Sequence, residues 1–174
     1  AITRHPIISD SEISVVVPAK TVGEVSRLLG STGGPVPVDA SRRYIVFSGG
    51  NYTVMSRLIE GEFLNYRNVV PEGYKTKAVV EVGPFEKTIE RSSVIITERL
   101  KNPLRLTFGE DGIHVKCQTP LGKVSDRIDA EIDGDTVEIG FNYRYLLDAL
   151  RNSGCDRVLL ELSGPLSPVK IRPV

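Results

Sequence analysis

The sequence predicts an α+β protein in which amphipathic helices pack on one face of antiparallel sheets. Short runs of β-branched and aromatic residues recur along the chain, separated by turns rich in Gly, Asp and Asn. Other segments carry apolar residues at helical spacing. A strand, an amphipathic helix and a meander of strands occur in this order once in residues 13–58 and twice in residues 77–174. Such repeats predict helices side by side on a continuous antiparallel sheet.

The first repeat begins with a β-rich segment at residues 15–17. A helix follows and stops at Gly30, a residue that suits a helix end. The meander continues through strands around residues 36–38, at 44–47 and at 52–58, with a turn at residues 48–51 between the last two. The apolar stripe of the helix consists of Val22, Val25, Leu28 and Leu29.

The second repeat begins with a strand at residues 77–82 and a helix that extends to about Thr97, with Phe85, Ile89 and Ser92 on its inner side. A hairpin follows, with strands at residues 104–108 and 113–118. A second hairpin is expected between a strand at 123–132 and one at 136–139, around Asp133, Gly134 and Asp135.

The third repeat contains a helix that Asn142 can cap. Its inner stripe has the spacing i, i+3, i+4 and i+7. Strands at residues 158–162 and 169–172 complete the chain. The stripe consists of Tyr143, Leu146, Leu147 and Leu150.

The composition indicates a folded chain without a strong electrostatic preference. The 174 residues include 22 Lys and Arg against 22 Asp and Glu, and tight autonomous DNA binding usually needs a clear excess of cations. No apolar run approaches the length of a membrane span, and no signal-peptide core is visible, so we expect a cytoplasmic protein without a membrane role. Pro71 and Gly73 mark the expected domain boundary.

The motifs of the common enzyme classes are absent from the sequence. It has no GxSxG, GxxxxGK[ST], HExxH or GxGxxG, and both His5 and His114 are isolated. Cys117 and Cys155 lack metal-ligand spacing and are expected to be reduced thiols that pack in the fold. We therefore expect no catalytic residue, no metal site and no cofactor.

Acidic residues alternate at positions 129, 131, 133 and 135. This pattern could indicate paired carboxylates or a calcium loop, but a solvated strand face explains it better. Apolar residues occupy the positions between them, and period-two spacing places the acids on the solvated face of a strand. A calcium loop would need further oxygen ligands at fixed spacing.

Each predicted helix also carries cations on its outer face. On isolated helices these are solvated faces of mixed charge. If the helices line one concave surface, the cations form a weak track that faces DNA phosphates without reading the base sequence. The residues are Lys20, Arg27, Lys87, Arg91, Arg144 and Arg151.

Three blocks of sequence together resemble the bacterial DNA sliding clamp, the beta subunit of DNA polymerase III. They are residues 56–71, 141–150 and 164–173. The resemblance implies the clamp fold, with residues 1–71 as the second half of the middle domain plus a connector. Residues 72–174 would be the C-terminal domain without its tail. The N-terminal domain has no counterpart in the sequence.

The resemblance also implies a non-catalytic function. Clamps are head-to-tail dimeric rings that encircle double-stranded DNA and tether the polymerase alpha subunit, the clamp loader and repair proteins. These partners insert linear motifs of the type Gln-x-x-Leu-Phe into a pocket between the middle and last domains. The corresponding pocket residues are Leu64, Asn68, Val69, Asn142, Tyr145, Leu166 and Pro168.

Two isoleucines, Ile95 and Ile96, resemble the apolar patch with which the last domain meets the other subunit of the ring. With no N-terminal domain to meet it, this patch is expected to be exposed. Two alternatives stay open: Val69, Tyr145 and Leu166 could be ordinary core residues. The chain could also be a stand-alone α+β peptide-binding or dimerisation module without a DNA role.

Overall fold

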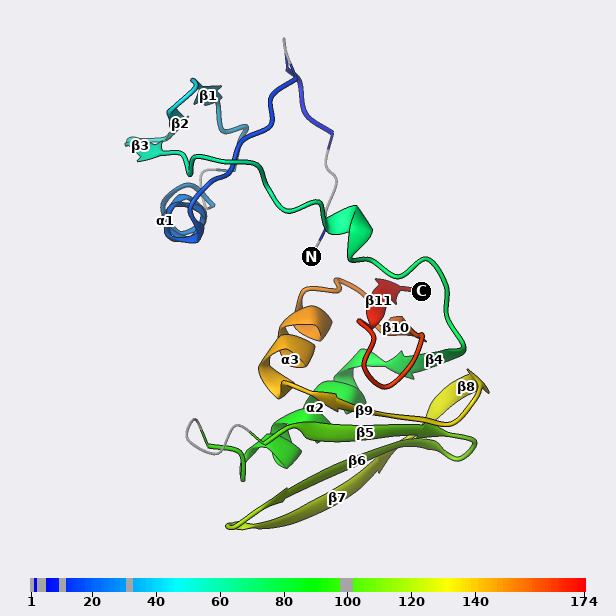
Figure 1. Ribbon diagram of the computed structural model, residues 1–174. Helices are drawn as coiled ribbons and strands as arrows, with labels where there is room; N and C mark the ends of the chain where they lie inside the picture. Colours follow the sequence, from blue (N-terminus) through cyan, green and yellow to red (C-terminus); the bar gives the residue numbers. More distant parts are fainter. Residues whose placement is uncertain (1, 3–5, 10–11, 31–32, 98–101) are drawn as a thin grey trace. The chain divides into compact units, whose positions relative to one another are not determined.

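The computed structural model describes residues 2, 6–9, 12–30, 33–97 and 102–174. These residues form two compact units, Ile2–Asn65 and Tyr66–Val174. Figure 1 shows both as helices combined with antiparallel strands, which confirms the predicted α+β class. The domain boundary expected at residues 71 and 72 stays a prediction.

The first unit contains one helix and one small sheet. The sheet has the order β1-β2-β3, with antiparallel pairing throughout. Gly50, with φ of +54°, makes the turn between β2 and β3 that the sequence predicts. The helix contacts β3 through a hydrogen bond of 2.6 Å between the hydroxyl oxygens of Thr21 and Ser56. The elements are α1 (Ala19–Leu29), β1 (Val38–Ala40), β2 (Tyr44–Gly49) and β3 (Tyr52–Arg57).

The strand predicted at residues 15–17 does not form. A strand needs a ladder of backbone hydrogen bonds. The backbone bond recorded for this segment is the one that the Ile59 N–H donates to the Val16 carbonyl oxygen, at 2.9 Å. The β-branched residues are therefore extended without a sheet partner.

The second unit has two helices and two four-stranded sheets, of order β11-β10-β4-β8 and β7-β6-β5-β9. It begins with a 3-10 helix, Tyr66–Asn68. The helices are α2 (Val82–Ser93) and α3 (Tyr143–Arg151). The strands are β4 (Thr76–Glu81), β5 (Leu104–Gly109), β6 (Gly112–Thr119), β7 (Gly122–Ile128), β8 (Ala130–Gly134), β9 (Val137–Phe141), β10 (Arg157–Leu162) and β11 (Lys170–Pro173).

One hydrophobic core joins both sheets and both helices of this unit. Burial alternates along β5, where Leu104, Leu106 and Phe108 are fully buried. The inner stripes of α2 and α3 contribute further to the same cluster, among them Phe85 and Leu147. The predicted stripe of α3 is thereby confirmed.

The expected single strand at residues 123–132 is wrong. The chain leaves one sheet at Ile128 and enters the other at Ala130, so Asp129 lies at a corner between β7 and β8. The unit consequently has two sheets in place of the continuous sheet that we expected.

The second predicted hairpin is wrong as well, because β8 pairs with β4 and β9 pairs with β5. Gly134 explains the choice of partner. Its φ is +118°, and a Cβ atom there would lie 2.1 Å from the carbonyl oxygen of Lys75. The Thr76 hydroxyl donates a 2.7 Å hydrogen bond to the Asp135 carbonyl oxygen and holds this close approach.

Helix α2 ends at Ser93, four residues before the predicted end at Thr97. The Ser93 hydroxyl donates to the carbonyl oxygen of Glu90 at 2.8 Å. Residues 94–97 are all β-branched, which lowers their helix propensity. Within the described part of the chain, no helix is both long and apolar enough to cross a membrane.

Candidate interaction surfaces

The first turn of α3 positions two of the predicted pocket residues. The Asn142 side-chain oxygen accepts a 3.1 Å hydrogen bond from the Arg144 backbone N–H, so Asn142 is the N-cap. Because Leu146 and Leu147 anchor the helix in the core, Tyr145 points outward and is 75% exposed. Asn142 and Tyr145 are three residues apart and therefore lie on the same side of the helix start.

The loop between β10 and β11 presents Leu166 and Pro168. Leu166 is 99% exposed, while Val169, next to Pro168, packs against the core. The ends of the loop are fixed by the pairing of Glu161 with Lys170. The exposed leucine thus protrudes from a loop with two rigid ends.

A buried carboxylate strengthens this strand pair. Glu161 contacts the Lys170 ammonium at 3.1 Å and the Arg172 guanidinium at 2.9 Å. Burial alone would raise the pKa of Glu161, but hydrogen bonds to Lys170 and Arg172 outweigh it and leave the pKa below its ordinary value. The cluster is charged at neutral pH and fixes the register beside the loop.

The connector before β4 carries Asn68 and Val69. The backbone N–H groups of Val69 and Val70 both donate to the Tyr66 carbonyl oxygen, at 3.0 and 3.1 Å, and close a tight turn. Val69 is 51% exposed. The Ser163 hydroxyl donates to the Gly73 carbonyl oxygen at 2.6 Å, which ties the end of the connector to the start of the β10–β11 loop.

The exposure of these residues removes one alternative. Val69, Tyr145 and Leu166 are not core residues, because each exposes at least half of its surface. Leu64, also exposed at 70%, belongs to the unit 2–65. Six of the seven predicted pocket residues thus lie on three exposed segments of one unit, and their assignment to a pocket stays a prediction.

A hollow of about 680 Å³ lies beside the start of α3. Asn142 lines it, and so does Ile96, which we predicted for subunit contact. Arg144, predicted to face DNA, and Tyr143, predicted for the inner stripe, line it too. The other lining residues were not predicted, because nothing in the local pattern connects the end of α2 with the β9–α3 junction. These are Thr97, Asn102, Pro103, Gly140 and Phe141.

Ile95 and Ile96 are half-buried and pack against the hydrophobic core. The expectation that both form an exposed patch is therefore wrong, while their assignment to the subunit contact stays a prediction. Their neighbour Val94 is 79% exposed instead. After the end of α2 the chain turns, with the Ile96 N–H donating to the Ser93 carbonyl oxygen at 2.9 Å, and both isoleucines turn toward the core.

At least three of the six predicted DNA-facing cations form ion pairs with described residues of the chain. Arg27 contacts Glu24, and Arg151 contacts Glu90, each at 2.6 Å. Arg91 contacts Asp126, also at 2.6 Å, and this hydrogen bond is the main reason that the pKa of Asp126 is lowered. The guanidinium of Arg144 lies over the Tyr143 ring, 5.8 Å from its centroid.

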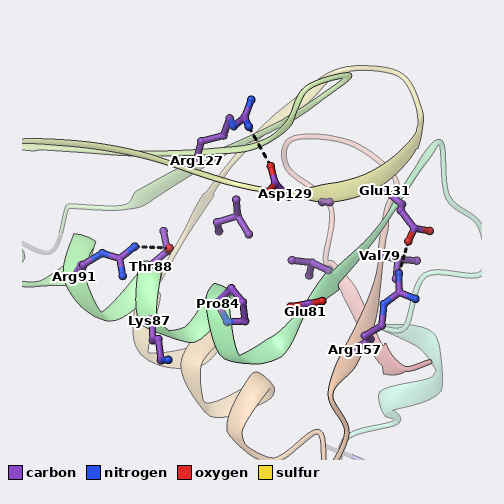
Figure 2. A pocket seen from close by; sticks show the side chains of 13 residues that line it. Val79, Glu81, Pro84, Lys87, Thr88, Arg91, Arg127, Asp129, Glu131 and Arg157 are labelled. Carbon is purple, nitrogen blue, oxygen red and sulfur yellow. Dashed lines mark hydrogen bonds and ion pairs between the residues drawn. The ribbon is translucent and has the colours of Figure 1, made fainter.

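Helix α2 borders a hollow of about 920 Å³ (Figure 2). Lys87 and Arg91 reach it from the helix, and residues 127–131 of the β7–β8 corner form the opposite wall. Four cations and three carboxylates line it, and two of the cations are paired with these carboxylates: Arg127 contacts Asp129 at 3.1 Å, and Arg157 pairs with Glu131. Of the described residues, none forms an ion pair with Lys87.

The acids of the corner are solvated, as predicted. Asp129, Glu131 and Asp133 are exposed, and Lys77 contacts Asp133 at 2.9 Å. The hydrogen bond to Asp133 also raises the pKa of Lys77. These carboxylates are engaged with cations of the same chain.

The histidines and thiols show no catalytic arrangement within the described residues. His114 contacts Asp111 at 2.8 Å on the β5–β6 hairpin, and His5 lies outside the residues that the structure describes. Burial raises the pKa of the Cys117 thiol, which disfavours the nucleophilic thiolate. The Cys155 sulfur lies 3.0 Å from the Arg157 carbonyl oxygen.

Comparison with known families matches almost the whole chain. Residues 67–174 match the family described as DNA polymerase III beta subunit, C-terminal domain. Residues 1–65 match the central domain of the same subunit. Among curated proteins, the beta sliding clamp of Staphylococcus aureus strain COL is 28% identical over 162 residues, which are 92% of this chain and 43% of that protein. The chain thus spans less than half the length of the curated relatives it matches.

Solved structures give the same result. A sliding clamp from Bacillus subtilis has a TM-score of 0.89 and 28% identity, covering 95% of this chain and 44% of that one. A clamp from Bartonella birtlesii bound to griselimycin has a TM-score of 0.84 and 32% identity, covering 91% and 43%. A putative beta subunit from Eubacterium rectale has 0.85 and 31%, with the same coverage.

Proposed function

The chain belongs to the family of bacterial DNA polymerase III beta subunits, the sliding clamps, and on this premise we propose that it is a non-catalytic processivity factor of DNA replication. The protein as a whole would encircle double-stranded DNA as a homodimeric ring. Residues 66–174 would supply a binding surface for the linear motifs of the polymerase, the clamp loader and other clamp partners. The mechanism is topological, and no bond is made or broken by the chain.

One observation carries the binding role: large apolar side chains are exposed on well-anchored segments. Tyr145 lies on a capped helix whose next two residues are buried, and Leu166 lies on a loop between paired strands. A soluble protein gains nothing from exposing Leu166 and Tyr145, but partner binding would bury them. Val69, on the tight turn of the connector, adds a third apolar group.

Nuclear magnetic resonance titration with a peptide of the type Gln-x-x-Leu-Phe tests this surface. We expect weak binding, with Kd toward the millimolar range, and shifts centred on Asn142, Tyr145 and Leu166. Tyr145→Ala or Leu166→Ala should weaken binding about tenfold or more, as loss of a contact residue does. Leu121→Ala is the matched control, because Leu121 is an exposed leucine on the β6–β7 turn. Equal effects of Leu166→Ala and Leu121→Ala would rule out this assignment.

The DNA role rests on cations that hold phosphates weakly. At least three of the six helix cations contact carboxylates of the described chain, so DNA must compete with Glu24, Glu90 and Asp126. Weak, sequence-independent contacts suit a ring that slides.

The salt dependence of duplex binding tests the DNA role. With at most six helix cations, the log-log slope should be no steeper than about −5, at about −0.9 for each phosphate contact. Lys87→Gln should flatten the slope by about one unit, while Lys75→Gln, at an exposed lysine outside the helices, should leave it unchanged. Tight binding to one base sequence, insensitive to salt, would contradict sliding.

A further inference from the structure

The sheet β7-β6-β5-β9 has a second face, opposite the one that packs on the hydrophobic core. Alternation along the strands directs Leu106, Val115 and Ile128 into the core and the next residues outward. We call the outward side of this sheet the outer face. Its side chains are Arg105, Thr107, His114, Lys116, Gln118, Lys123, Ser125, Arg127 and Glu138.

Like charges lie directly opposite each other on the outer face. Arg105 is the cross-strand partner of Lys116. Directly opposed like charges destabilise a sheet. Glu138 offsets the charge of Arg105 through a contact of 2.8 Å. Neither Lys116 nor Lys123 has an ion-pair partner within the described chain.

Arg105, Lys116 and Lys123 surround a hollow of about 560 Å³. Its described lining includes no carboxylate, since Glu138 contacts Arg105 from outside it, whereas Glu81, Asp129 and Glu131 line the hollow beside α2 (Figure 2). The remaining lining residues are Asn102, Pro103, Cys117, Gln118, Val124 and Ser125, of which Pro103 supplies an apolar ring on the outer face. The Asn102 side chain donates to the Gln118 carbonyl oxygen at 2.7 Å and closes one end.

The carboxylate next to this hollow responds to its positive field. The pKa of Glu138 is lowered, first by the hydrogen bond from Arg105, then by the one from Thr107, with Lys116 adding a smaller electrostatic contribution. The environment therefore favours negative charge at this place.

We propose that the outer face is a docking surface for a short acidic peptide segment of a protein partner, with Lys116, Lys123 and Arg105 as its carboxylate contacts. Cations on three adjacent strands span roughly 10 Å, which suits two or three neighbouring Asp or Glu side chains. Glu138 and Asp111 border the basic area. A continuous phosphate backbone would meet these acids, whereas a short peptide can end before them. The apolar ring of Pro103 in the hollow also fits a peptide side chain better than a phosphate.

Fluorescence anisotropy on the full chain tests the proposal. The probe is a labelled hexapeptide that contains four Glu, compared with its Gln counterpart and with a single-stranded decamer of thymidine nucleotides. We expect the acidic peptide to bind at low salt, and the Gln counterpart not to bind. The Lys116→Gln, Lys123→Gln double variant should weaken binding about tenfold, the factor expected for two exposed charge pairs.

An Arg42→Gln, Lys75→Gln double variant is the control, because it removes the same charge from exposed positions elsewhere. It should bind the acidic peptide like the parent chain. Thermal unfolding should show that Lys116→Gln does not lower Tm, since it removes a like-charge contact with Arg105. Equal losses in both double variants, or no binding of the acidic peptide, would overturn the proposal. Tighter binding of the thymidine decamer that the Lys116→Gln, Lys123→Gln pair abolishes would assign the face to nucleic acid and overturn it too.

Discussion

Residues 66–174 contain two copies of a helix-and-strand unit and residues 2–65 contain one, and the two parts bury apolar side chains to different extents. In the larger unit two copies share one core, to which both helices and both sheets contribute. In the smaller unit the buried hydrophobic residues of the described chain are Leu29, Ile45 and Leu58. Val22 of α1 and Met55 of β3 remain exposed. A single copy of the unit supplies secondary structure, whereas a pair supplies a core.

The largest expected difference between the two units is the cost of truncating a core residue. Phe85 is fully buried in the shared core, and Phe85→Ala should lower the free energy of unfolding of residues 66–174 by about 4 kcal/mol. Ile45→Ala should cost about 2 kcal/mol, because its half-exposed surroundings can collapse onto the space. Hydrogen exchange followed by mass spectrometry separates β5–β6 peptides from β2–β3 peptides. Equal acceleration of exchange in both units by Phe85→Ala would show one cooperative core instead of two.

The segment after α2 gives a second, smaller effect within the larger unit. Ile96→Asp should destabilise residues 66–174 by about 2 to 3 kcal/mol, because it places a charge against the core without a partner. Val94→Asp should be within about 0.5 kcal/mol of the parent, since Val94 is exposed. Urea unfolding followed by circular dichroism measures both. A neutral Ile96→Asp variant would return Ile96 to the exposed patch that the sequence predicts.

The smallest expected effect on folding stability comes from lowering the pH. The folded pKa of Glu161 lies below its unfolded value, so its ion pairs stabilise residues 66–174 above the unfolded pKa of about 4.3 and lose this contribution as pH falls through the folded pKa. Glu161→Gln should cost about 1 to 2 kcal/mol at pH 7, and its stability should approach that of the parent toward pH 3. The ion pairs of residues 2–65 are exposed, so Glu24→Gln should change little at any pH. Parallel pH curves for Glu161→Gln and the parent would contradict the buried-pair interpretation.

Structural features that depend on neighbouring residues could be predicted from the sequence in both units. The Asn142 cap, the stripes of α2 and α3 and the Gly50 turn depend on residues that are close in sequence, and each formed as expected. The corner at Asp129 could not be found in this way. Alternation continues unchanged through it, since Ile128 and Ala130 both point inward, and only the long-range pairing of Thr76 with Gly134 decides the sheet.

The candidate site also has some features that the sequence predicts and others that it does not. The exposure of Tyr145 follows from helical periodicity, because Leu146 and Leu147 occupy the inner stripe. The burial of Ile95 and Ile96 does not follow from periodicity. These residues lie after the end of the helix, and a β-branched run there has the same composition whether it lies on a surface or in a core. The cluster of cations on the outer face was also not predicted from the sequence. Arg105 and Lys116 are eleven residues apart, and only strand register places them opposite each other.

The corner at Asp129 also determines how residues 66–174 would carry a mechanical load. A single residue joins β7 of one sheet to β8 of the other, so tension along either strand is transmitted to both sheets through the covalent backbone. Sliding one sheet past the other would require the antiparallel pairs β6–β7 and β4–β8 to shear together, with all their hydrogen bonds loaded at once. This unit should therefore yield to pulling as one body, with high resistance and an abrupt rupture.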